Sequence, residues 1–307
     1  MIDNIASRGT YRPVAVACAL VATICVAGRS HADEASGANG ANGATMPPMQ
    51  TDVIYRTVDG VDVKLDVQLP PPGRQNHAAV LLIHGGGWSS GDKAQLRDAA
   101  RAIADRGYVA ATIGYRLAPA HRYPAAVDDV RSATRFVKLQ ASQWDIDPDR
   151  VGAIGFSAGA HLAMMLAVAD NNDVFEVPDN TGPTSDVAAA VSYFGPTDLA
   201  GPKIPERSRE ILTQFFGGDR DALADQYRQA SPITHLDPRD APMLLFQGTN
   251  DILVPADQAV RMAEAMTRNA VDGRVELLIG KSHGWAGETL DRTREESLRF
   301  FERHLLR

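Results

Sequence analysis

The sequence predicts an α/β fold: a mostly parallel, eight-stranded sheet with helices on both faces and a small cap insertion. Short apolar runs without polar alternation recur along the chain, which is typical of parallel strands buried on both faces. Stretches with helical spacing separate these runs, and strand–helix alternation over this length indicates a sheet with right-handed crossovers. A hydrophobic fraction of 44% and a charged fraction of 22% are ordinary for a globular domain, which we expect at residues 51–307.

The first two strands are predicted to form a hairpin, because Val53–Val58 and Val63–Leu69 flank the turn signal Asp59-Gly60. Six further strands are expected, at Ala79–Ile83, Val109–Ile113, Val151–Ile154, Ala188–Val191, Met243–Phe246 and Val275–Ile279. Helices are expected at Lys93–Arg106, Ala125–Gln143, Ala158–Ala169, Ala256–Arg268 and Glu288–Leu305. Residues 198–235 separate two of the strands without a strand of their own, so we expect them to form a cap over the functional site.

The N-terminal residues 1–32 have the pattern of a secretory signal peptide. Arg8 and Arg12 precede an uncharged apolar run, Val14–Ala27, and Ser30-His31-Ala32 then offers small residues for a signal peptidase. The run is shorter than the roughly 20 residues that a membrane-spanning helix needs, so we expect cleavage and not an anchor. The mature protein is therefore expected to be secreted or periplasmic, with no membrane attachment.

Residues 33–50 follow as a low-complexity leader rich in Gly, Ala and Asn, which lacks the apolar content to pack and is expected to be flexible. Both cysteines of the chain, Cys18 and Cys25, lie within the predicted signal peptide. Cleavage after Ala32 would leave no cysteine, so no disulfide is expected even in an oxidising compartment.

The charge balance excludes some classes of partner. The formal net charge is −7, and it becomes more negative when residues 1–32, with three arginines and one aspartate, are removed. An acidic surface repels nucleic acid and anionic membranes and fits a neutral or weakly polar substrate. The histidines have no metal-ligand spacing and no Gly-rich phosphate loop is present, so neither a metal nor another cofactor is expected. The sequence does not determine the oligomeric state.

The segment Gly155-Phe156-Ser157-Ala158-Gly159 lies where a predicted strand meets a predicted helix. Such a turn forces its serine into a strained backbone conformation, and the two flanking glycines remove side chains that would clash there. The serine would also lie at the N-terminus of a helix, where the free backbone N–H groups stabilise a developing oxyanion. We therefore predict that Ser157 is a nucleophile.

A serine hydroxyl needs a base, and in this kind of fold the order along the chain is serine, acid, histidine. His283 lies in a short loop after the strand Val275–Ile279, at the edge where active-site residues gather, and is the predicted base. The two other histidines after the serine are less well placed: His235 belongs to the cap region, and His304 to the terminal helix.

The acid is expected after the preceding strand. Asp251, in the loop that follows Met243–Phe246, is placed to accept a hydrogen bond from Nδ1 of His283. Asp257 and Asp272 are the alternatives, but Asp257 is better explained as a charge in the first turn of a helix, and Asp272 lies beside Gly273 in a turn.

The loop His84-Gly85-Gly86-Gly87-Trp88 follows the strand Ala79–Ile83. Its glycines let the backbone approach a substrate carbonyl, so the N–H groups of Gly86 and Gly87, with that of Ala158, are predicted to form an oxyanion hole. His84 is expected to bond the loop backbone. Trp88 and Trp285 flank the site and are predicted substrate-binding walls, with core packing as the open alternative for both.

These motifs resemble the α/β-hydrolase esterases over nearly all of residues 52–307. Segments such as Tyr115-Arg116-Leu117-Ala118-Pro119 are similar to the hormone-sensitive-lipase-like carboxylesterases. Gly155-Phe156-Ser157-Ala158-Gly159, Gly248-Thr249-Asn250-Asp251 and Gly87-Trp88-Ser89-Ser90-Gly91-Asp92-Lys93 look more like the bacterial feruloyl-esterase-like group, which is related to acetyl-xylan esterases and kynurenine formamidases.

The resemblance implies a serine carboxylic-ester hydrolase acting on short-chain or aromatic acyl esters, among them acetyl or feruloyl esters of plant polysaccharide. The substrate would be a small molecule or a polysaccharide. An amidase, arylformamidase or peptidase using the same triad is the alternative. A binding module without activity is a third class, which is disfavoured because all three triad members are present.

Overall fold

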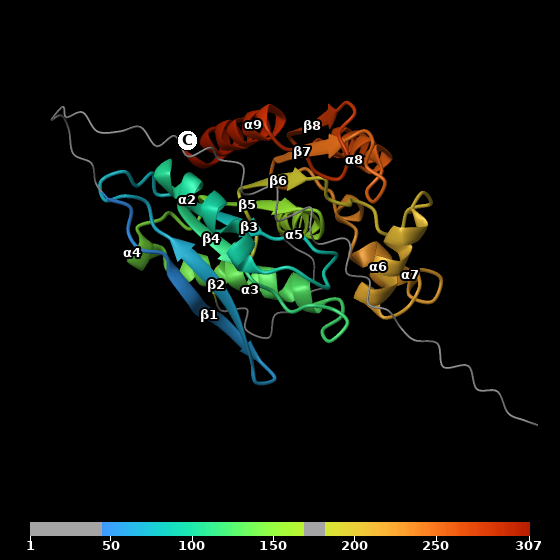
Figure 1. Cartoon of the computed structure of the whole chain (residues 1–307), viewed down its shortest axis with the longest axis horizontal. Coiled ribbons are helices and arrows are strands. Elements are labelled where there is room, and N and C mark those ends of the chain that lie inside the picture. Colours follow the sequence, from blue (N-terminus) through green and yellow to red (C-terminus); the bar gives the residue numbers. More distant parts are fainter. Residues whose placement is uncertain (1–44, 169–181) are drawn as a thin grey trace, which may run out of the picture.

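The computed structural model describes residues 45–168 and 182–307. Within these residues, one eight-stranded sheet runs through the molecule with the order β1-β2-β4-β3-β5-β6-β7-β8 (Figure 1). The strands are β1 (Gln50–Val58), β2 (Val61–Gln68), β3 (Ala79–Ile83), β4 (Val109–Ile113), β5 (Val151–Phe156), β6 (Ala189–Tyr193), β7 (Met243–Gly248) and β8 (Gly273–Leu278). The predicted mostly parallel sheet is therefore confirmed, with the predicted strand positions shifted by a few residues.

The pairing of the strands follows from their connections. β1 and β2 form the predicted antiparallel hairpin, and β2 also pairs antiparallel with β4, whereas β3 to β8 pair with their neighbours in parallel. Parallel neighbours need a crossover, which helices supply here. The carboxyl ends of β5, β7 and β8 consequently lie at the same edge of the sheet.

Helices cover both faces of the sheet (Figure 1). They are α2 (Arg97–Asp105), α3 (Ala125–Leu139), α4 (Ala141–Trp144), α5 (Ala158–Ala167), α6 (Glu206–Phe216), α7 (Ala224–Gln229), α8 (Ala256–Arg268) and α9 (Glu288–Leu305). One hydrophobic cluster lies between the sheet and α3, α5 and α8, and a second lies between the sheet and α2 and α9.

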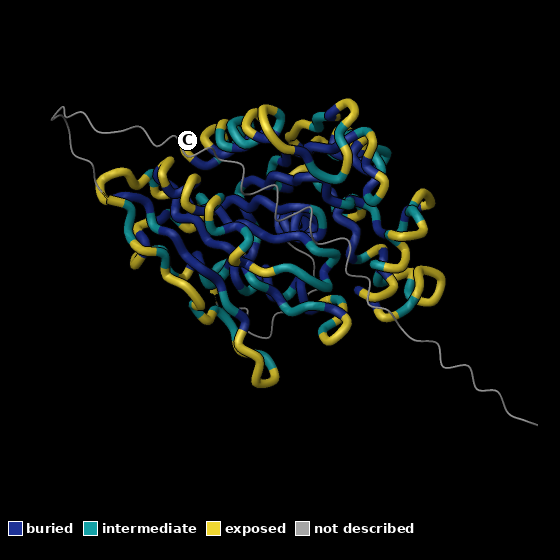
Figure 2. The backbone as a smooth tube through the Cα atoms, viewed as in Figure 1, coloured by how far each residue is buried: buried dark blue, intermediate teal, exposed yellow. Residues whose placement is uncertain are grey.

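Strand β3 explains why the central runs are apolar without alternation. Leu81 belongs to the first cluster and Leu82 to the second, so successive side chains enter different cores. Both are almost completely buried, and Figure 2 shows the same burial along the central strands, with exposed residues at the outer loops. A strand covered on both faces has no solvent side on which a polar residue would be favoured.

Two predicted helices are broken in the structure. Lys93–Arg106 begins with a short 3₁₀ helix, Lys93–Leu96, capped by the Asp92 side chain, before α2 starts. The stretch Ala125–Gln143 divides into α3 and α4 at Gln140, whose conformation ends the first helix. Apolar spacing continues across both junctions, which is why the pattern alone predicted single helices.

The predicted signal peptide and most of the predicted leader lie outside the described residues. The end of the leader does not behave as predicted, because Met46 and Met49 pack against the second cluster and Gln50 already begins β1. The Gln68 amide also donates to the Pro47 carbonyl at 2.7 Å. The average composition of residues 33–50 did not predict this packing, because only the two methionines supply the apolar contacts.

Residues 198–235 hold α6, α7 and a short 3₁₀ helix, Pro232–Thr234.

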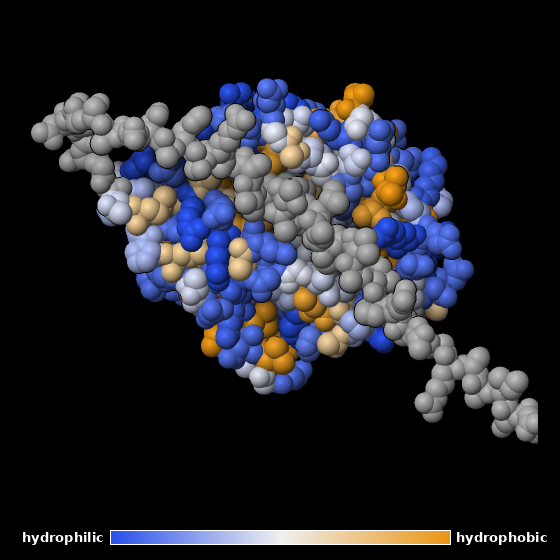
Figure 3. Space-filling view, viewed as in Figure 1, coloured by the Kyte–Doolittle hydropathy of each residue, from blue (hydrophilic) through white to orange (hydrophobic). Residues whose placement is uncertain are grey.

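The described surface in Figure 3 is mostly hydrophilic, with apolar side chains scattered over it. In the described part of the chain, no helix is both long and apolar enough to cross a membrane.

Candidate active site

Ser157 stands at the sharp turn between β5 and α5. Its φ is 54° and its ψ is −118°, in the left-handed half of conformational space that non-glycine residues rarely adopt. A Cβ on Gly155 would lie 2.1 Å from the Gly159 carbonyl oxygen, and one on Gly159 would lie 2.2 Å from that of Ile83. The turn is therefore possible only because both flanking positions are glycine.

His283 lies within reach of both of its predicted partners. Its Nε2 is 2.9 Å from Oγ of Ser157, and its Nδ1 is 2.7 Å from Oδ2 of Asp251. The Asp251 side chain is fully buried, whereas that of His283 keeps 16% of its surface exposed. The three side chains predicted to act together thus form one continuous line of hydrogen bonds.

The Asp251 carboxylate is held by three further donors. The backbone N–H groups of Leu253 and Val254 each donate to Oδ1 at 2.9 Å, and the Gln247 amide donates to Oδ2 at 3.0 Å. Because these bonds occupy both oxygens, the carboxylate has a single orientation, with Oδ2 facing His283. Sequence reasoning missed Gln247, although its position at the end of β7, four residues before Asp251, was a signal for it.

The loops that carry the acid and the histidine are bound to each other. The Asn250 N–H donates to the Lys281 carbonyl at 2.8 Å, and the Gly280 N–H donates to the Thr249 hydroxyl at 2.9 Å. A Cβ on Gly248 would lie 2.4 Å from the carbonyl oxygens of the histidine loop, so only glycine permits this approach. The two loops form one unit at the end of β7 and β8.

The alternative acids and bases lie elsewhere in the structure. Asp257 pairs with Lys203 and Arg261 near the start of α8. His235 bonds the Gln229 carbonyl, and His304 packs against Phe300 on α9. None of them reaches Ser157.

The glycine loop packs directly against the serine. A Cβ on Gly85 would lie 3.3 Å from Cβ of Ser157 and 2.7 Å from the Phe156 carbonyl oxygen. Gly86 and Gly87 follow with φ values of 114° and 59°. Within residues 45–168 and 182–307, nothing accepts a hydrogen bond from the N–H groups of these two glycines or of Ala158. The structure thus places the start of the glycine loop against Ser157 and leaves the N–H groups of the three predicted oxyanion donors without an acceptor among the described residues.

His84 supports this loop. Its Nδ1 is 2.8 Å from the Gly85 carbonyl oxygen, and its ring stacks on Tyr115 with centroids 4.3 Å apart. The Tyr115 hydroxyl in turn donates to the His84 carbonyl at 2.9 Å. Burial lowers the pKa of His84, which favours the neutral ring. These contacts agree with the expectation that His84 bonds the loop backbone.

The two tryptophans differ in their surroundings, and both are buried. Trp285 stacks on Tyr193 with centroids 5.7 Å apart and donates to the Thr293 hydroxyl of α9. It belongs to the cluster under the α9 face, so its contacts are those of a core residue and not of a pocket wall. It touches the site indirectly, through Phe194, whose ring packs edge-on against His283 at 4.7 Å.

Trp88 ends the glycine loop, and its ring stacks on Phe215 of α6 with centroids 4.4 Å apart. A Cβ on Gly87 would lie 2.9 Å from Cγ2 of Ile211, so α6 packs directly on the loop. At the other end of α6, the Ser208 hydroxyl donates to the Leu253 carbonyl beside the acid. Helix α6 therefore contacts both the glycine loop and the acid loop.

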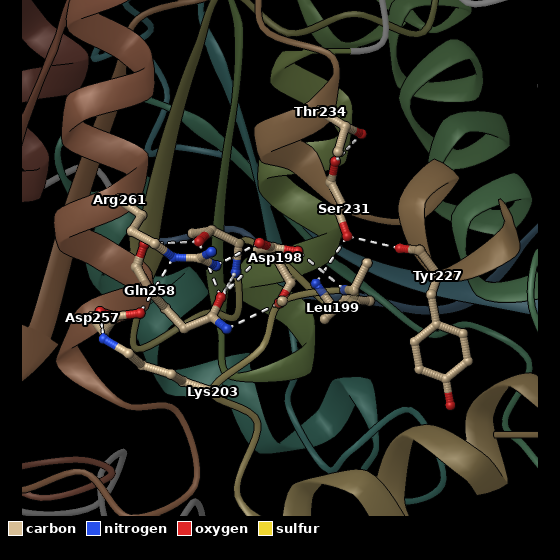
Figure 4. A network of polar contacts seen from close by, with 12 residues as sticks. Asp198, Leu199, Lys203, Tyr227, Ser231, Thr234, Asp257, Gln258 and Arg261 are labelled. Atoms are coloured by element: carbon tan, nitrogen blue, oxygen red, sulfur yellow. Dashed lines mark hydrogen bonds and ion pairs between the residues drawn. The ribbon is translucent and has the colours of Figure 1, made fainter. Parts of the chain in front are cut away.

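A network of polar contacts fastens the two ends of the 198–235 segment (Figure 4). The Gln258 side chain of α8 accepts from the N–H groups of Thr197 and Asp198 at 2.9 and 2.7 Å and donates to the Asp198 carbonyl. Where the segment returns, the Ser231 hydroxyl accepts from the Leu199 N–H and donates to the Tyr227 carbonyl. The start of the segment is thus bound to α8, and its return is bound to its own start at Leu199.

Comparison with known proteins agrees with this geometry. The BD-FAE family model matches residues 65–266. A probable carboxylic ester hydrolase, LipM of Mycobacterium tuberculosis (strain ATCC 25618 / H37Rv), is 31% identical over 240 residues, which cover 70% of this chain and 53% of LipM. A probable isoprenylcysteine alpha-carbonyl methylesterase, ICMEL1 of Arabidopsis thaliana, is 28% identical over 246 residues, covering 77% and 51%. The chain spans about half the length of these curated relatives.

Solved structures share the fold over most of the chain. The propionate-bound thermophilic esterase Est2 of Thermogutta terrifontis has a TM-score of 0.70 and 28% identity, covering 86% of this chain and 95% of Est2. A truncated carbohydrate esterase from gut microbiota has a TM-score of 0.71 at 23% identity, covering 86% and 99%. With its α/β-hydrolase fold and the family match over residues 65–266, the chain belongs to the BD-FAE family.

Proposed function

We propose that this protein is a serine carboxylic-ester hydrolase in which Ser157 is the nucleophile, His283 the general base and acid, and Asp251 the residue that orients the imidazole. The observation that carries the proposal is the unbroken line of hydrogen bonds, at 2.7 and 2.9 Å, from Asp251 through His283 to Ser157. The ester hydrolases among the relatives support the same reaction class.

The first half of the reaction forms an acyl-enzyme. Nε2 of His283 removes the Ser157 proton as Oγ attacks the ester carbonyl, and the carbonyl oxygen becomes an oxyanion between Ala158 and the Gly86–Gly87 loop. Asp251 stabilises the resulting imidazolium through its bond to Nδ1. His283 then gives its proton to the leaving alcohol oxygen, and the C–O bond breaks.

The second half repeats these steps with water. His283 takes a proton from a water molecule, which attacks the acyl carbonyl, and then returns a proton to Ser157 as the carboxylic acid leaves. No charge accumulates on the protein over the cycle, since each proton taken by the imidazole is returned.

Short acyl groups are the substrates we propose. The propionate and butyrate in the Est2 structures support a short acyl chain for that relative, and helix α6 against Gly87 limits the space beside the donors here. Acetyl esters of polysaccharide, which an exported enzyme would meet after loss of residues 1–32, are the more specific form of the proposal, and feruloyl esters are the aromatic alternative.

The test compares wild type with Ser157→Ala on p-nitrophenyl acetate, propionate and butyrate, a feruloyl ester and acetylated xylan. We expect Ser157→Ala to lose activity by about 10⁴-fold or more, because the remaining groups only bind and polarise the ester. A fluorophosphonate probe should label wild type at Ser157 and not label the variant.

Ser132→Ala is the matched control, because Ser132 is a half-buried helical serine of α3 that bonds the Asp128 carbonyl away from the site. It should hydrolyse esters and take up the probe like wild type. Substantial hydrolysis by Ser157→Ala would refute the serine mechanism, and a preference for formamides over every ester would replace esterase by amidase.

A further inference from the structure

His161 is a buried histidine that the proposed ester hydrolysis does not use. It lies on α5 one turn after Ser157, and its backbone N–H donates to the Ser157 carbonyl at 3.1 Å. Its Nε2 is 2.6 Å from the Ala230 carbonyl oxygen, and its Nδ1 is 3.3 Å from Nε1 of Trp88. A polar ring buried this completely, with a defined partner at each nitrogen, is a specific arrangement.

The two partners fix the proton on the ring. A tryptophan Nε1 can only donate, so Nδ1 of His161 must carry the lone pair. A carbonyl oxygen can only accept, so Nε2 must carry the hydrogen. Only the neutral Nε2–H tautomer satisfies both contacts, and a second proton on Nδ1 would point at the Trp88 N–H.

The backbone of Trp88 is strained and must be held by its contacts. Its φ is 56°, positive like the φ values of Gly86 and Gly87. A bulky residue adopts a positive φ only when its surroundings fix it. The indole lies edge-on to His161 at 5.1 Å and stacks on Phe215 at 4.4 Å. These ring contacts and the bond to Nδ1 hold Trp88, and with it the peptide that precedes it.

The Ala230 carbonyl is itself held in place. The Ala230 N–H donates to the Gln226 carbonyl at 2.9 Å. The next residue, Ser231, bonds Leu199 and Tyr227 in the network of Figure 4. His161 therefore connects three parts of the chain: the helix of the serine, the glycine loop, and the return of the 198–235 segment.

We propose that His161 is a positioning residue that sets the separation of the two halves of the oxyanion hole. One half, the Ala158 N–H, belongs to the same first turn of α5 as His161. The other half, at Gly86 and Gly87, is joined to Trp88. The His161–Trp88 hydrogen bond spans the two halves, so its loss would let the loop donors move relative to Ser157. This inference rests on the proposed function.

The experiment uses the full chain with three variants. Trp88→Phe removes the indole N–H and keeps a ring to stack on Phe215, and His161→Leu removes both polar contacts. His161→Gln keeps an acceptor for Trp88 and a donor for Ala230 and should restore most of the activity that leucine loses. Kinetics on a short acyl ester, binding of a trifluoromethyl ketone, fluorophosphonate labelling and thermal unfolding are measured for each.

We expect kcat to fall about tenfold or more in Trp88→Phe and His161→Leu, with KM within about twofold, because an oxyanion contact acts mainly in the transition state. Affinity for the trifluoromethyl ketone, whose adduct carries an oxyanion, should fall by a similar factor. Labelling of Ser157 should still go to completion, since the triad is intact. A fourth protein, the double variant Trp88→Phe/His161→Leu, should be no worse than the poorer of its two single variants, because both substitutions remove the same bond.

Trp144→Phe is the matched control. Trp144 is also a buried indole, but it lies on α4 against Phe136, and its Nε1 has no hydrogen-bond partner in the described part of the chain. The proposal is overturned if both test variants keep kcat within twofold of wild type, or if Trp144→Phe lowers kcat and ketone binding equally. A wild-type protein that neither hydrolyses esters nor takes up the probe would refute the proposed function, and this role with it.

Discussion

Ser157 has a backbone conformation that its neighbours hold against local preference. Its N–H donates to the Tyr193 carbonyl at 2.9 Å, its carbonyl accepts from His161, and the glycines two positions to either side let the chain pass. A left-handed serine costs on the order of 1–3 kcal/mol, which persists only where such contacts fix it. The strain directs Oγ away from the helix and toward Nε2 of His283.

The buried state of His161 predicts a specific loss of stability in acid. Burial lowers its pKa from 6.5 to about 4, with the Ala230 carbonyl partly opposing the shift. Between these pH values the unfolded chain binds a proton that the folded protein does not. The free energy of unfolding therefore falls as the pH falls from about 6.5 to about 4, by about 3 kcal/mol from this residue, and changes no further below that.

Urea unfolding of wild type and His161→Gln between pH 7 and pH 3.5 measures this contribution. The variant should lack the His161 part of the acid-dependent loss, while it keeps that of His84, whose pKa burial also lowers. Parallel stability curves for the two proteins would contradict the assignment.

At the scale of elements, the 198–235 segment packs apolar side chains of α6 and α7 into the first hydrophobic cluster, and a few polar side chains fix its entry. Gln258 on α8 bonds the backbone of Thr197 and Asp198, and Arg261, one turn further, pairs with the Asp198 carboxylate at 2.5 Å. The entry to the segment is consequently fixed to the helix that follows the acid loop.

Gln258→Ala should loosen this attachment. The change leaves the buried Thr197 N–H, and the N–H and carbonyl of half-buried Asp198, without their Gln258 partner, which costs about 2–4 kcal/mol. We expect faster proteolytic cleavage within residues 198–235 under native conditions and a lower free energy of unfolding in urea. Glu264→Ala, at an exposed position of the same helix, should cleave and unfold like wild type. Equal rates of cleavage within residues 198–235 in Gln258→Ala and Glu264→Ala would show that the network does not hold the segment.

The elements themselves were largely predictable, and the exceptions have local causes. Runs such as Val109–Ile113 are apolar because both sheet faces are covered, and α8 matches its predicted ends because Pro255 precedes it. The break at Gln140 was not predictable, since apolar residues continue on both sides of it. The packing of Met46 and Met49 was missed because a composition average hides two residues.

At the scale of the whole molecule, the sheet joins two hydrophobic clusters into one cooperative unit. Phe301 of α9 is fully buried, and a Cβ on Gly152 of β5 would lie 2.7 Å from its ring. The terminal helix is thus packed on the strand that leads to Ser157, so the last turns of the chain contribute to the stability of the central strands.

Phe301→Ala should lower the free energy of unfolding by about 3–5 kcal/mol, because it leaves a cavity that the tightly packed strand cannot fill. Urea unfolding followed by far-UV circular dichroism and by tryptophan fluorescence should give one coincident transition at a lower midpoint. Phe300→Ala, at the neighbouring and only partly buried ring, is expected to cost clearly less. Similar losses in the two variants, or separate transitions, would contradict a single packed unit.

The sequence by itself determined the fold class and the approximate strand positions, because periodicity is a local property. It also predicted that Ser157, Asp251 and His283 lie together, from the order in which they follow their strands, and the structure joins them by hydrogen bonds. It also pointed to Gly86, Gly87 and Ala158 as oxyanion donors, from a glycine loop after one strand and the residue that follows the serine. Only the tertiary structure decided what surrounds them: Gln247 on the acid, Trp285 in the core, and His161 between Trp88 and Ala230. The role of His161 depends on contacts with residues 69 and 73 positions away, which no local pattern specifies and only the packing of the chain creates.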